Sequence, residues 1–118
     1  MPIYNQTRQT LIAENVFVAK SFFARAKGLL GKKTLGPDEA LVIPGCQAIH
    51  MVFMRFPIDV IFVDKKGLVA GLVPGIKPFC LSPIFFNAAF AIELKAGTIA
   101  RTRTNKGDRL EMGSLDRV

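Results

Sequence analysis

The sequence predicts an α+β fold that is mainly β, a small compact antiparallel or mixed β-barrel-like domain with one or two short helices. The chain has 118 residues, the length of one typical domain, so we expect residues 1–118 to form a single domain. Half of the residues are apolar, which is enough for a core without disulfide bonds. Short runs rich in Val, Ile and Phe alternate with Gly, Pro and Asp turn signals, as is typical of strands.

The N-terminal half is expected to hold several strands and one helix. Thr10–Ala19 mixes β-branched and aromatic residues and predicts one strand or a pair of short strands. Ser21 is a candidate N-cap, and the apolar residues after it recur at helical spacing. Ala40–Ile43 predicts a short strand. Pro57 then divides Ile49–Asp64 into two strands, because proline cannot donate to a sheet ladder.

The C-terminal half is expected to be strands joined by turns. The signal Asp-Lys-Lys-Gly at residues 64–67 predicts a hairpin turn into the strand Leu68–Val73. Three prolines make Pro74–Ala88 a long irregular loop. A strand, a short helix or extended connector, and a last strand follow at Ala89–Lys95, Thr98–Thr104 and Arg109–Met112.

The chain is basic, with a formal net charge of +7. Nucleic acid, an acidic protein or a lipid surface are therefore candidate partners, although a basic solvated surface is the simpler explanation. The cations form two clusters: Lys20, Arg25, Lys27, Lys32 and Lys33, and then Lys95, Arg101, Arg103, Lys106 and Arg109. The phenylalanines are not interleaved with these cations, and the sequence has no helix-turn-helix, zinc-finger or RNP-like pattern. Both observations argue against nucleic-acid binding.

Targeting patterns and cysteines indicate a cytoplasmic protein. Met1–Thr10 lacks the apolar stretch of a signal peptide. The longest apolar runs, such as Ile58–Val63, are far shorter than the roughly 20 residues that span a bilayer, so we expect no membrane span. Cys46 and Cys80 match neither a disulfide framework nor a zinc motif.

Several motifs, taken in order, resemble a known family. They are Arg25-x-x-Gly28-Leu29-Leu30-Gly31, the block IHMVFMRFPIDVIF at Ile49–Phe62, Glu93-Leu94-x-Ala96-Gly97, and Gly107-Asp108. The series resembles the uncharacterised family DUF-192 (DUF192, also called UPF-0127) over about residues 21–112. The resemblance implies a small mixed domain dominated by strands and attaches no activity to it. Many members carry an export signal or a membrane anchor, and neither pattern is seen at the start of this sequence.

Asp59 is the first candidate binding residue. Alternation after Pro57 places Asp59 on one face of a strand that is apolar on both faces, so we expect its carboxylate to be at least partly buried. A buried carboxylate needs hydrogen bonds, a cation or a proton. Asp59 is therefore either a general base or ligand anchor, or a structural group that accepts backbone N–H bonds or pairs with Arg55.

His50, the only histidine, has several interpretations. It could form an acid–base pair with Asp59, or join Cys46, Met51 and Met54 in a copper-like site. Strand alternation should point Met51 away from His50, which argues against a compact metal site and favours a packed histidine. Cys46 and His50 remain weak candidates for metal ligands. They could also form a nucleophile pair. We expect no metal or cofactor.

Two further features complete the candidates. Glu93 lies in an apolar strand and could share a pocket with Asp59, or pair with Arg25 or Lys95 at the sheet edge. The loop Pro74–Ala88 carries six large apolar residues: Ile76, Phe79, Leu81, Ile84, Phe85 and Phe86. Such side chains either fold onto the core or face a partner, as a lid over a pocket or as a homodimer contact.

The leading hypothesis is a non-enzymatic module that binds an unknown small ligand or a protein partner. Its pocket would lie between the segment Cys46–Asp59 and the loop Pro74–Ala88. The candidate binding residues are His50, Met54, Arg55, Asp59 and Glu93. The alternatives are a hydrolase or metal-dependent enzyme that uses Asp59, Glu93 and His50, and a basic nucleic-acid-binding protein. Convergence of those three side chains on one pocket would favour the enzyme, and capped or scattered carboxylates the binding module.

Overall fold

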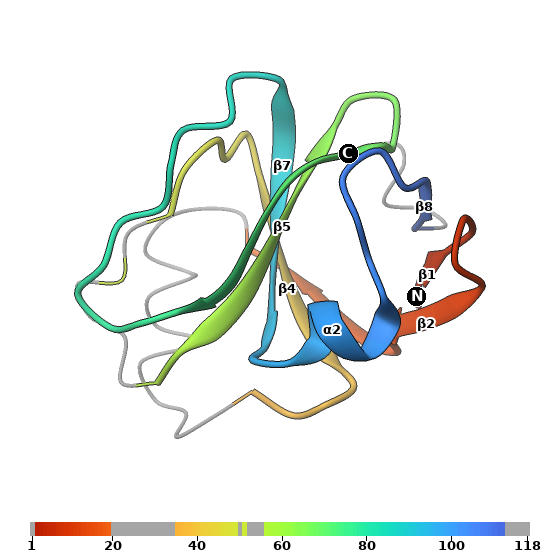
Figure 1. The fold of residues 1–118 in the computed structure, drawn as a ribbon, viewed down its shortest axis with the longest axis horizontal. Helices are drawn as coiled ribbons and strands as arrows, with labels where there is room; N and C mark the ends of the chain where they lie inside the picture. Colours follow the sequence, from red (N-terminus) through yellow and green to blue (C-terminus); the bar gives the residue numbers. More distant parts are fainter. Residues whose placement is uncertain (1, 20–34, 50, 52–55, 113–118) are drawn as a thin grey trace.

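The computed structural model describes residues 2–19, 35–49, 51 and 56–112, which form two β-sheets and one short helix (Figure 1). The elements are β1 (Ile3–Asn5), β2 (Thr10–Ala13), β3 (Asn15–Val18), β4 (Glu39–Pro44), β5 (Ile58–Asp64), β6 (Val69–Ile76), β7 (Ala88–Lys95), α2 (Thr98–Thr102) and β8 (Leu110–Glu111). Within these residues, no helix has both the length and the apolar character that crossing a bilayer requires.

The larger sheet has the strand order β3-β4-β7-β5-β6, and the smaller sheet has the order β2-β1-β8. Strands β3 and β4 pair in parallel, and the other pairs of both sheets are antiparallel. The predicted mainly β class with a short helix is confirmed. Within the described residues the two sheets do not close into a barrel, although an antiparallel bridge between Leu68 and Arg109 links them.

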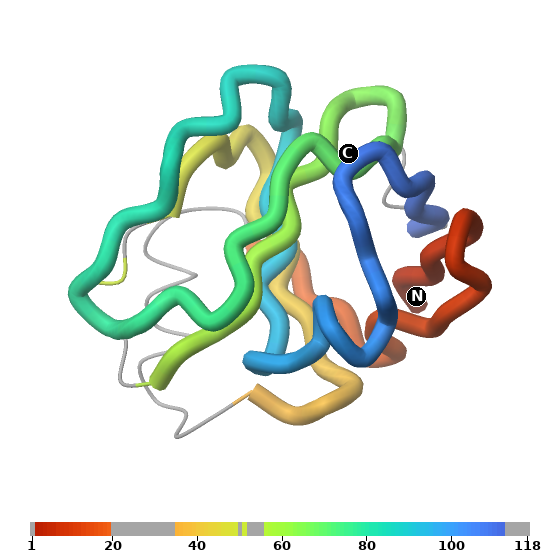
Figure 2. The backbone as a smooth tube through the Cα atoms, viewed as in Figure 1, coloured from red at the N-terminus to blue at the C-terminus, as the bar shows by residue number. Residues whose placement is uncertain are grey.

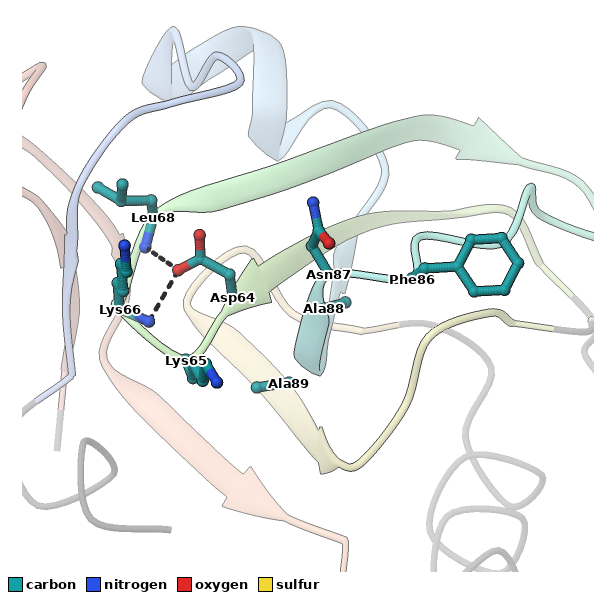
Figure 3. Close-up of a pocket in the computed structure, with 8 residues that line it drawn as sticks. All are labelled: Asp64, Lys65, Lys66, Leu68, Phe86, Asn87, Ala88 and Ala89. Carbon is teal, nitrogen blue, oxygen red and sulfur yellow. Dashed lines mark hydrogen bonds between the residues drawn. The ribbon is translucent and has the colours of Figure 1, made fainter.

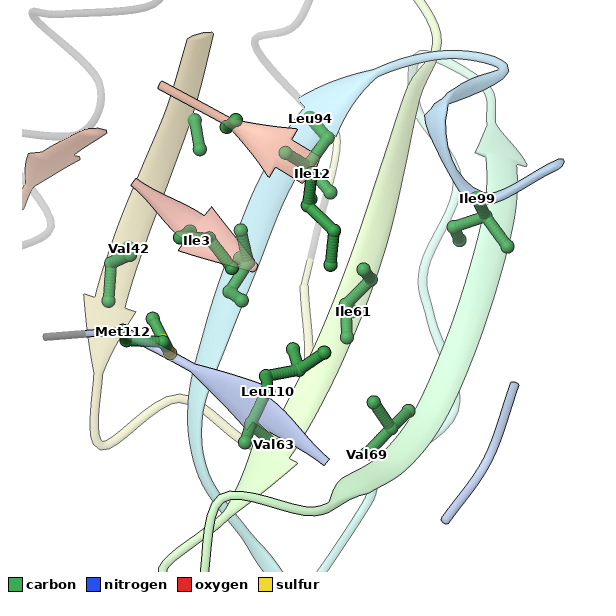
Figure 4. Close-up of a cluster of buried hydrophobic side chains, with 13 residues drawn as sticks. Ile3, Ile12, Val42, Ile61, Val63, Val69, Leu94, Ile99, Leu110 and Met112 are labelled. Carbon is green, nitrogen blue, oxygen red and sulfur yellow. The ribbon is translucent and has the colours of Figure 1, made fainter. Parts of the chain in front are cut away.

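The centre of the larger sheet is buried on both faces. Strand β5, with the sequence IDVIFVD, is buried at every residue except its last. The first core, which includes Ile61 and Leu94, lies against the smaller sheet and Ile99 of α2 (Figure 4). The second core lies on the other face and includes Val60 and Phe62. An apolar layer on each face explains why β5 is a continuous apolar run rather than an alternating one.

Most of the predicted elements in the described residues are confirmed. The segment Thr10–Ala19 forms the pair β2 and β3, and the turn at residues 64–67 joins β5 to β6 as an antiparallel hairpin. For Thr98–Thr104 the sequence allowed a short helix or an extended connector, and the segment contains the helix α2. The short strand β1 was not predicted, and the helix expected after Ser21 lies outside the described residues.

Asp108 joins the two ends of the described chain. Its Oδ2 accepts hydrogen bonds from Asn5 Nδ2 at 3.0 Å, Arg8 Nε at 3.1 Å and the backbone N–H of Asn105 at 2.9 Å. The side chain of Asp108 is only 4% exposed. Burial by itself raises the pKa of this carboxyl, but the hydrogen bonds and the Arg8 charge outweigh burial and hold the pKa below its ordinary value of 3.8.

The lowered pKa of Asp108 predicts an acid-dependent loss of stability. A depressed folded pKa contributes stability above the unfolded pKa, and this contribution disappears as the pH falls through the folded value. We therefore expect the free energy of unfolding to fall as the pH drops below about 4. Asp108→Asn should cost about 1–2 kcal/mol at neutral pH and flatten that dependence. Urea unfolding at several pH values measures both effects, and superimposable profiles for the two proteins would contradict the assignment.

Candidate functional site

The carboxylate of Asp59 is buried and hydrogen-bonded to the backbone. Its side chain lies on β5, and the residue is 1% exposed. Oδ1 accepts from the N–H of Gly75 at 2.8 Å, and Oδ2 accepts from the N–H groups of Gly97 at 3.1 Å and Ile99 at 2.8 Å. The expected burial is confirmed. Of the roles that the sequence allowed for Asp59, these bonds match the structural one, in which the carboxylate accepts backbone N–H groups.

The three donors show what Asp59 holds in place. Residue Ile58 pairs with Ile76, but Val60 pairs with Val73, so β6 contains one extra residue opposite Asp59. Gly75 lies in this bulge with a φ of 59°, where a residue with a side chain would be strained. The other two donors, Gly97 and Ile99, lie at the start of α2. Asp59 thus ties the bulge and the helix to β5.

The two buried carboxylates Asp59 and Glu93 lie on opposite faces of the larger sheet. Directly paired residues of antiparallel strands point to the same face. Asp59 pairs with Leu94 of the first core, whereas Glu93 pairs with Val60 of the second core. Glu93 is fully buried and has an interaction partner of its own. The sheet register therefore does not bring the two carboxylates into one pocket.

The remaining site candidates divide between the described and the other residues. His50, Met54 and Arg55 lie outside the described residues. Cys46 is half-buried, and its Sγ donates to the carbonyl oxygen of Ala48 at 3.1 Å. Cys80 is exposed, and the two cysteines are thiols rather than a disulfide. In the part of the chain that the structure describes, no three His, Cys, Asp or Glu side chains gather as a metal site would require.

Three cations of the second basic cluster are used within the fold. Arg101 donates to the carbonyl oxygens of Leu11 and Ile12 at 3.3 and 3.2 Å. Arg103 donates to the carbonyl oxygen of Arg8 at 3.3 Å, and Arg109 to that of Lys66 at 3.2 Å. These bonds join segments far apart in sequence, which gives this cluster a structural role in addition to its charge.

The segment between β6 and β7, residues 77–87, is the most apolar exposed part of the described chain, and we call it the tip loop. Its large exposed side chains are Phe79 (77% exposed), Leu81 (74%), Ile84 (57%) and Phe86 (77%). The prediction of a long irregular loop is confirmed, except that β6 continues to Ile76. Of the apolar residues in the predicted loop, Ile76 is buried and Phe85 is half-buried.

The backbone of the tip loop is held by a ladder of hydrogen bonds. Met51 donates to the carbonyl oxygen of Cys80 at 2.9 Å and accepts from the N–H of Phe79 at 2.8 Å. Ile49 accepts from the N–H of Ser82 at 2.9 Å, and Gln47 accepts from that of Phe85 at 2.8 Å. Figure 2 shows the two segments side by side, away from the N-terminal strands. The tip loop is therefore irregular but fixed along its length.

Phe85 anchors the tip loop to the second core. Its ring centroid lies 4.5 Å from that of Phe62. The ring also covers Gly71 so closely that a Cβ atom there would lie 2.1 Å from Phe85 Cε1. Gly71 pairs with Phe62 across β5 and β6, so glycine provides the space in which the Phe85 ring sits.

Phe79 occupies an unusual backbone conformation. The N–H of Cys80 donates to the carbonyl oxygen of Lys77 at 3.2 Å, which closes a turn with Pro78 and Phe79 at its centre. Phe79 has a φ of 66°. Proline followed by a residue of positive φ is the pattern of a type II turn, in which the second central position is normally glycine or asparagine. An aromatic residue is strained at that position by about 1–2 kcal/mol.

An open pocket of about 580 Å³ lies beside the tip loop (Figure 3). Its lining residues are Asp64, Lys65, Lys66, Leu68, Phe86, Asn87, Ala88 and Ala89. Asp64 accepts from the backbone N–H groups of Lys66 at 2.8 Å and Leu68 at 3.0 Å, so its carboxylate fixes the hairpin turn. The sequence pattern predicted a pocket elsewhere and indicated no role for Lys65 and Lys66 beyond the turn. The fold brings both lysines to the same pocket as Phe86.

Comparison with known proteins identifies the relatives of this chain. The family model DUF192, described as "Uncharacterized ACR, COG1430", matches residues 3–112. A curated relative, the UPF0127 protein of Thermococcus sibiricus (strain DSM 12597 / MM 739), is 27% identical over 113 residues, which cover 92% of this chain and 73% of that protein.

Two solved structures have the same fold. A protein of unknown function from Novosphingobium aromaticivorans DSM 12444 has a TM-score of 0.80 at 22% identity, covering 95% of this chain and 84% of that one. A putative transcription regulator from Sinorhizobium meliloti 1021 has a TM-score of 0.77 at 22% identity, with 93% and 89% covered. At this level of identity the likeness extends to the fold and not to the function.

Proposed function

We propose that this chain, which belongs to the DUF192 family, is a non-enzymatic binding module that docks onto a partner through the tip loop. The observation that carries the proposal is the exposure of four large apolar side chains on one loop: Phe79, Leu81, Ile84 and Phe86. Exposed apolar side chains gathered in this way mark interaction sites in soluble proteins.

The order of the loop backbone supports docking. Five backbone N–H groups of the tip loop and its end donate within the chain, those of Phe79, Cys80, Ser82, Phe85 and Ala88. Pro78 and Pro83 have no N–H group and restrict the backbone further. A preorganised loop loses little conformational entropy on binding, which leaves more of the contact energy for affinity.

The arrangement of the buried carboxylates supports a binding module over a hydrolase. Asp59 is occupied by three backbone donors, and Glu93 lies on the opposite face of the sheet. His50 and Arg55 remain proposed polar contacts and Met54 a proposed binding residue, because in the sequence they lie close to Met51, which bonds to the tip loop. Asp59 enters this proposal as a positioning residue for β6, the strand that leads into the loop.

Fractionation of cell extracts tests the proposal and does not require the partner to be identified first. The tagged full chain, produced at low level, is separated by sedimentation and gel filtration. We expect part of the wild-type protein to migrate as a bound form, well above the 12.9 kDa monomer. Replacing Phe79, Leu81, Ile84 and Phe86 together by serine should reduce the bound fraction at least tenfold, because each buried apolar side chain contributes about 1.5–3 kcal/mol.

Leu11→Ser is the matched control, because Leu11 is a large apolar residue, 39% exposed, on β2 of the smaller sheet. It should leave the bound fraction unchanged. Wild-type protein that migrates only as a free monomer would refute docking. A bound form that survives the fourfold substitution would place the docking surface outside the tip loop.

A further inference from the structure

We propose that the partner of the tip loop is the surface of an anionic phospholipid bilayer, on which the protein lies without spanning it. This inference rests on the proposed docking function and names the partner. Peripheral proteins bind such surfaces by inserting apolar side chains into the interface while nearby cations meet the headgroups. The tip loop and its surroundings have both features.

The charge around the tip loop is mainly positive, with three lysines against one aspartate. Lys77 lies within the loop and is exposed. Lys65 and Lys66 line the pocket to which Phe86 contributes, and the carboxylate of Asp64 in that pocket is bound by backbone N–H groups. The sequence has no Asp or Glu at residues 40–58 or 65–92, which include the tip loop and its ladder partners. The loop therefore lies in a region that attracts anions.

The same charge argues against a second copy of the chain as the partner. Each copy has a formal net charge of +7, so two copies that meet through a mainly basic region repel each other. Each lysine at the surface of an anionic bilayer instead raises the affinity of the protein for the bilayer by about fivefold. A lipid interface also adapts to side chains of different shape and needs no matching pocket for Phe79 or Phe86.

The backbone of the tip loop suits an apolar environment. Unpaired peptide groups are costly when they leave water. In the tip loop, the carbonyl groups of Lys77, Cys80, Pro83, Phe85 and Phe86 accept hydrogen bonds from within the chain. Together with the paired N–H groups and the two prolines, these bonds lower the cost of moving the loop into the interface.

The conformation of Phe79 provides an independent indication. In the turn at residues 77–80, glycine would relieve the backbone strain, yet the chain has an aromatic ring that is 77% exposed. Among the described residues the ring belongs to neither core, and we attribute its presence to a contact outside the chain. An aromatic ring next to Lys77 is well placed for insertion beside a headgroup contact.

Vesicle co-sedimentation tests the proposal with the full chain. We expect the protein to sediment with vesicles of phosphatidylcholine and phosphatidylglycerol in equal amounts, and much less with phosphatidylcholine alone. Phe79→Gly should lower the partition coefficient about tenfold while the melting temperature stays at or above that of wild type, because glycine relieves the turn. Lys77→Gln should lower partition about fivefold, and added salt should remove the contribution of charge but not that of the loop.

Several results would overturn the proposal. One is sedimentation with anionic vesicles that Phe79→Gly leaves unchanged, since adsorption by charge alone does not use the loop. Another is the absence of binding to both vesicle types together with a dimer that Phe79→Gly disrupts. That result would make a second copy of the chain the partner. If vesicles fail while extracts still show a loop-dependent bound form, the docking function stands and only the lipid assignment is wrong. If neither assay depends on the loop, both proposals fail.

Discussion

Asp59→Ala is expected to lower the free energy of unfolding by about 3–5 kcal/mol, a large effect for a single substitution. The substitution removes the acceptor of three backbone N–H groups, those of Gly75, Gly97 and Ile99. Each donor is then left without its partner in a buried or partly buried setting. Urea unfolding of the variant and the wild type measures the difference.

Asp59→Asn separates the hydrogen bonds from simple loss of volume. Asparagine keeps one carbonyl oxygen that can accept, but its NH2 group faces N–H donors where Asp59 has its second oxygen. We expect an intermediate loss of about 2–3 kcal/mol. The β6 bulge should loosen in both variants, seen as faster amide exchange at Gly75. A loss below about 1 kcal/mol for Asp59→Ala would refute the positioning role.

Gly71→Ala is expected to cost about 2–4 kcal/mol, because the new methyl group and the Phe85 ring cannot occupy the same space. The ring must leave its place against Phe62, which gives up both the ring contact and the burial of Phe85. Since Phe85 anchors the tip loop, amide exchange should also rise at Phe85 and Ser82, whose N–H groups bond to Gln47 and Ile49.

A double-mutant cycle gives the control for Gly71. In a Phe85→Ala background the obstructing ring is absent, so Gly71→Ala should become nearly neutral or slightly stabilising, as expected for glycine replaced by alanine in a strand. An equal cost of Gly71→Ala in both backgrounds would show that Phe85 is not the cause and that the loop is anchored in another way.

The burial of Asp59 could be predicted from sequence, but its partners could not. A strand that is apolar on both faces implies that any carboxylate within it is withdrawn from water, and Asp59 follows this rule. The donors are 16, 38 and 40 residues away along the chain. Only the β6 bulge and the turn before α2 bring them to β5, and neither the bulge nor the sheet order leaves a local pattern in the sequence.

The separation of Asp59 from Glu93 has a similar origin. Each residue lies in an apolar strand, and both strands were predicted correctly. Whether the two side chains share a face depends on how β5 and β7 align, and a shift of one residue would reverse the answer. Strand alternation within one segment cannot determine that register, so the shared pocket remained an open alternative until the pairing was known.

The tip loop shows the same limit. Its composition predicted either core packing or a partner contact, and the structure places Phe85 half-buried against Phe62 but leaves Phe86 exposed. The ladder to Gln47, Ile49 and Met51 decides which side chains turn inward, and long-range pairing of an irregular loop has no periodic signature. The strand β1 was missed for a simpler reason, since three residues are too few for a pattern.

Tryptophan fluorescence of a Phe86→Trp variant tests the central claim most directly, because the chain contains no other tryptophan and the indole emission would come from the tip loop alone. We expect the emission wavelength and acrylamide quenching of water-exposed indole in the free monomer. On addition of anionic vesicles the emission should move to shorter wavelength and be quenched by brominated lipid. Phe90→Trp, a partly buried position against the first core, should show neither change. Short-wavelength emission from the free Phe86→Trp monomer would contradict the exposure of the tip loop, and no response to the vesicles would contradict its insertion into a bilayer.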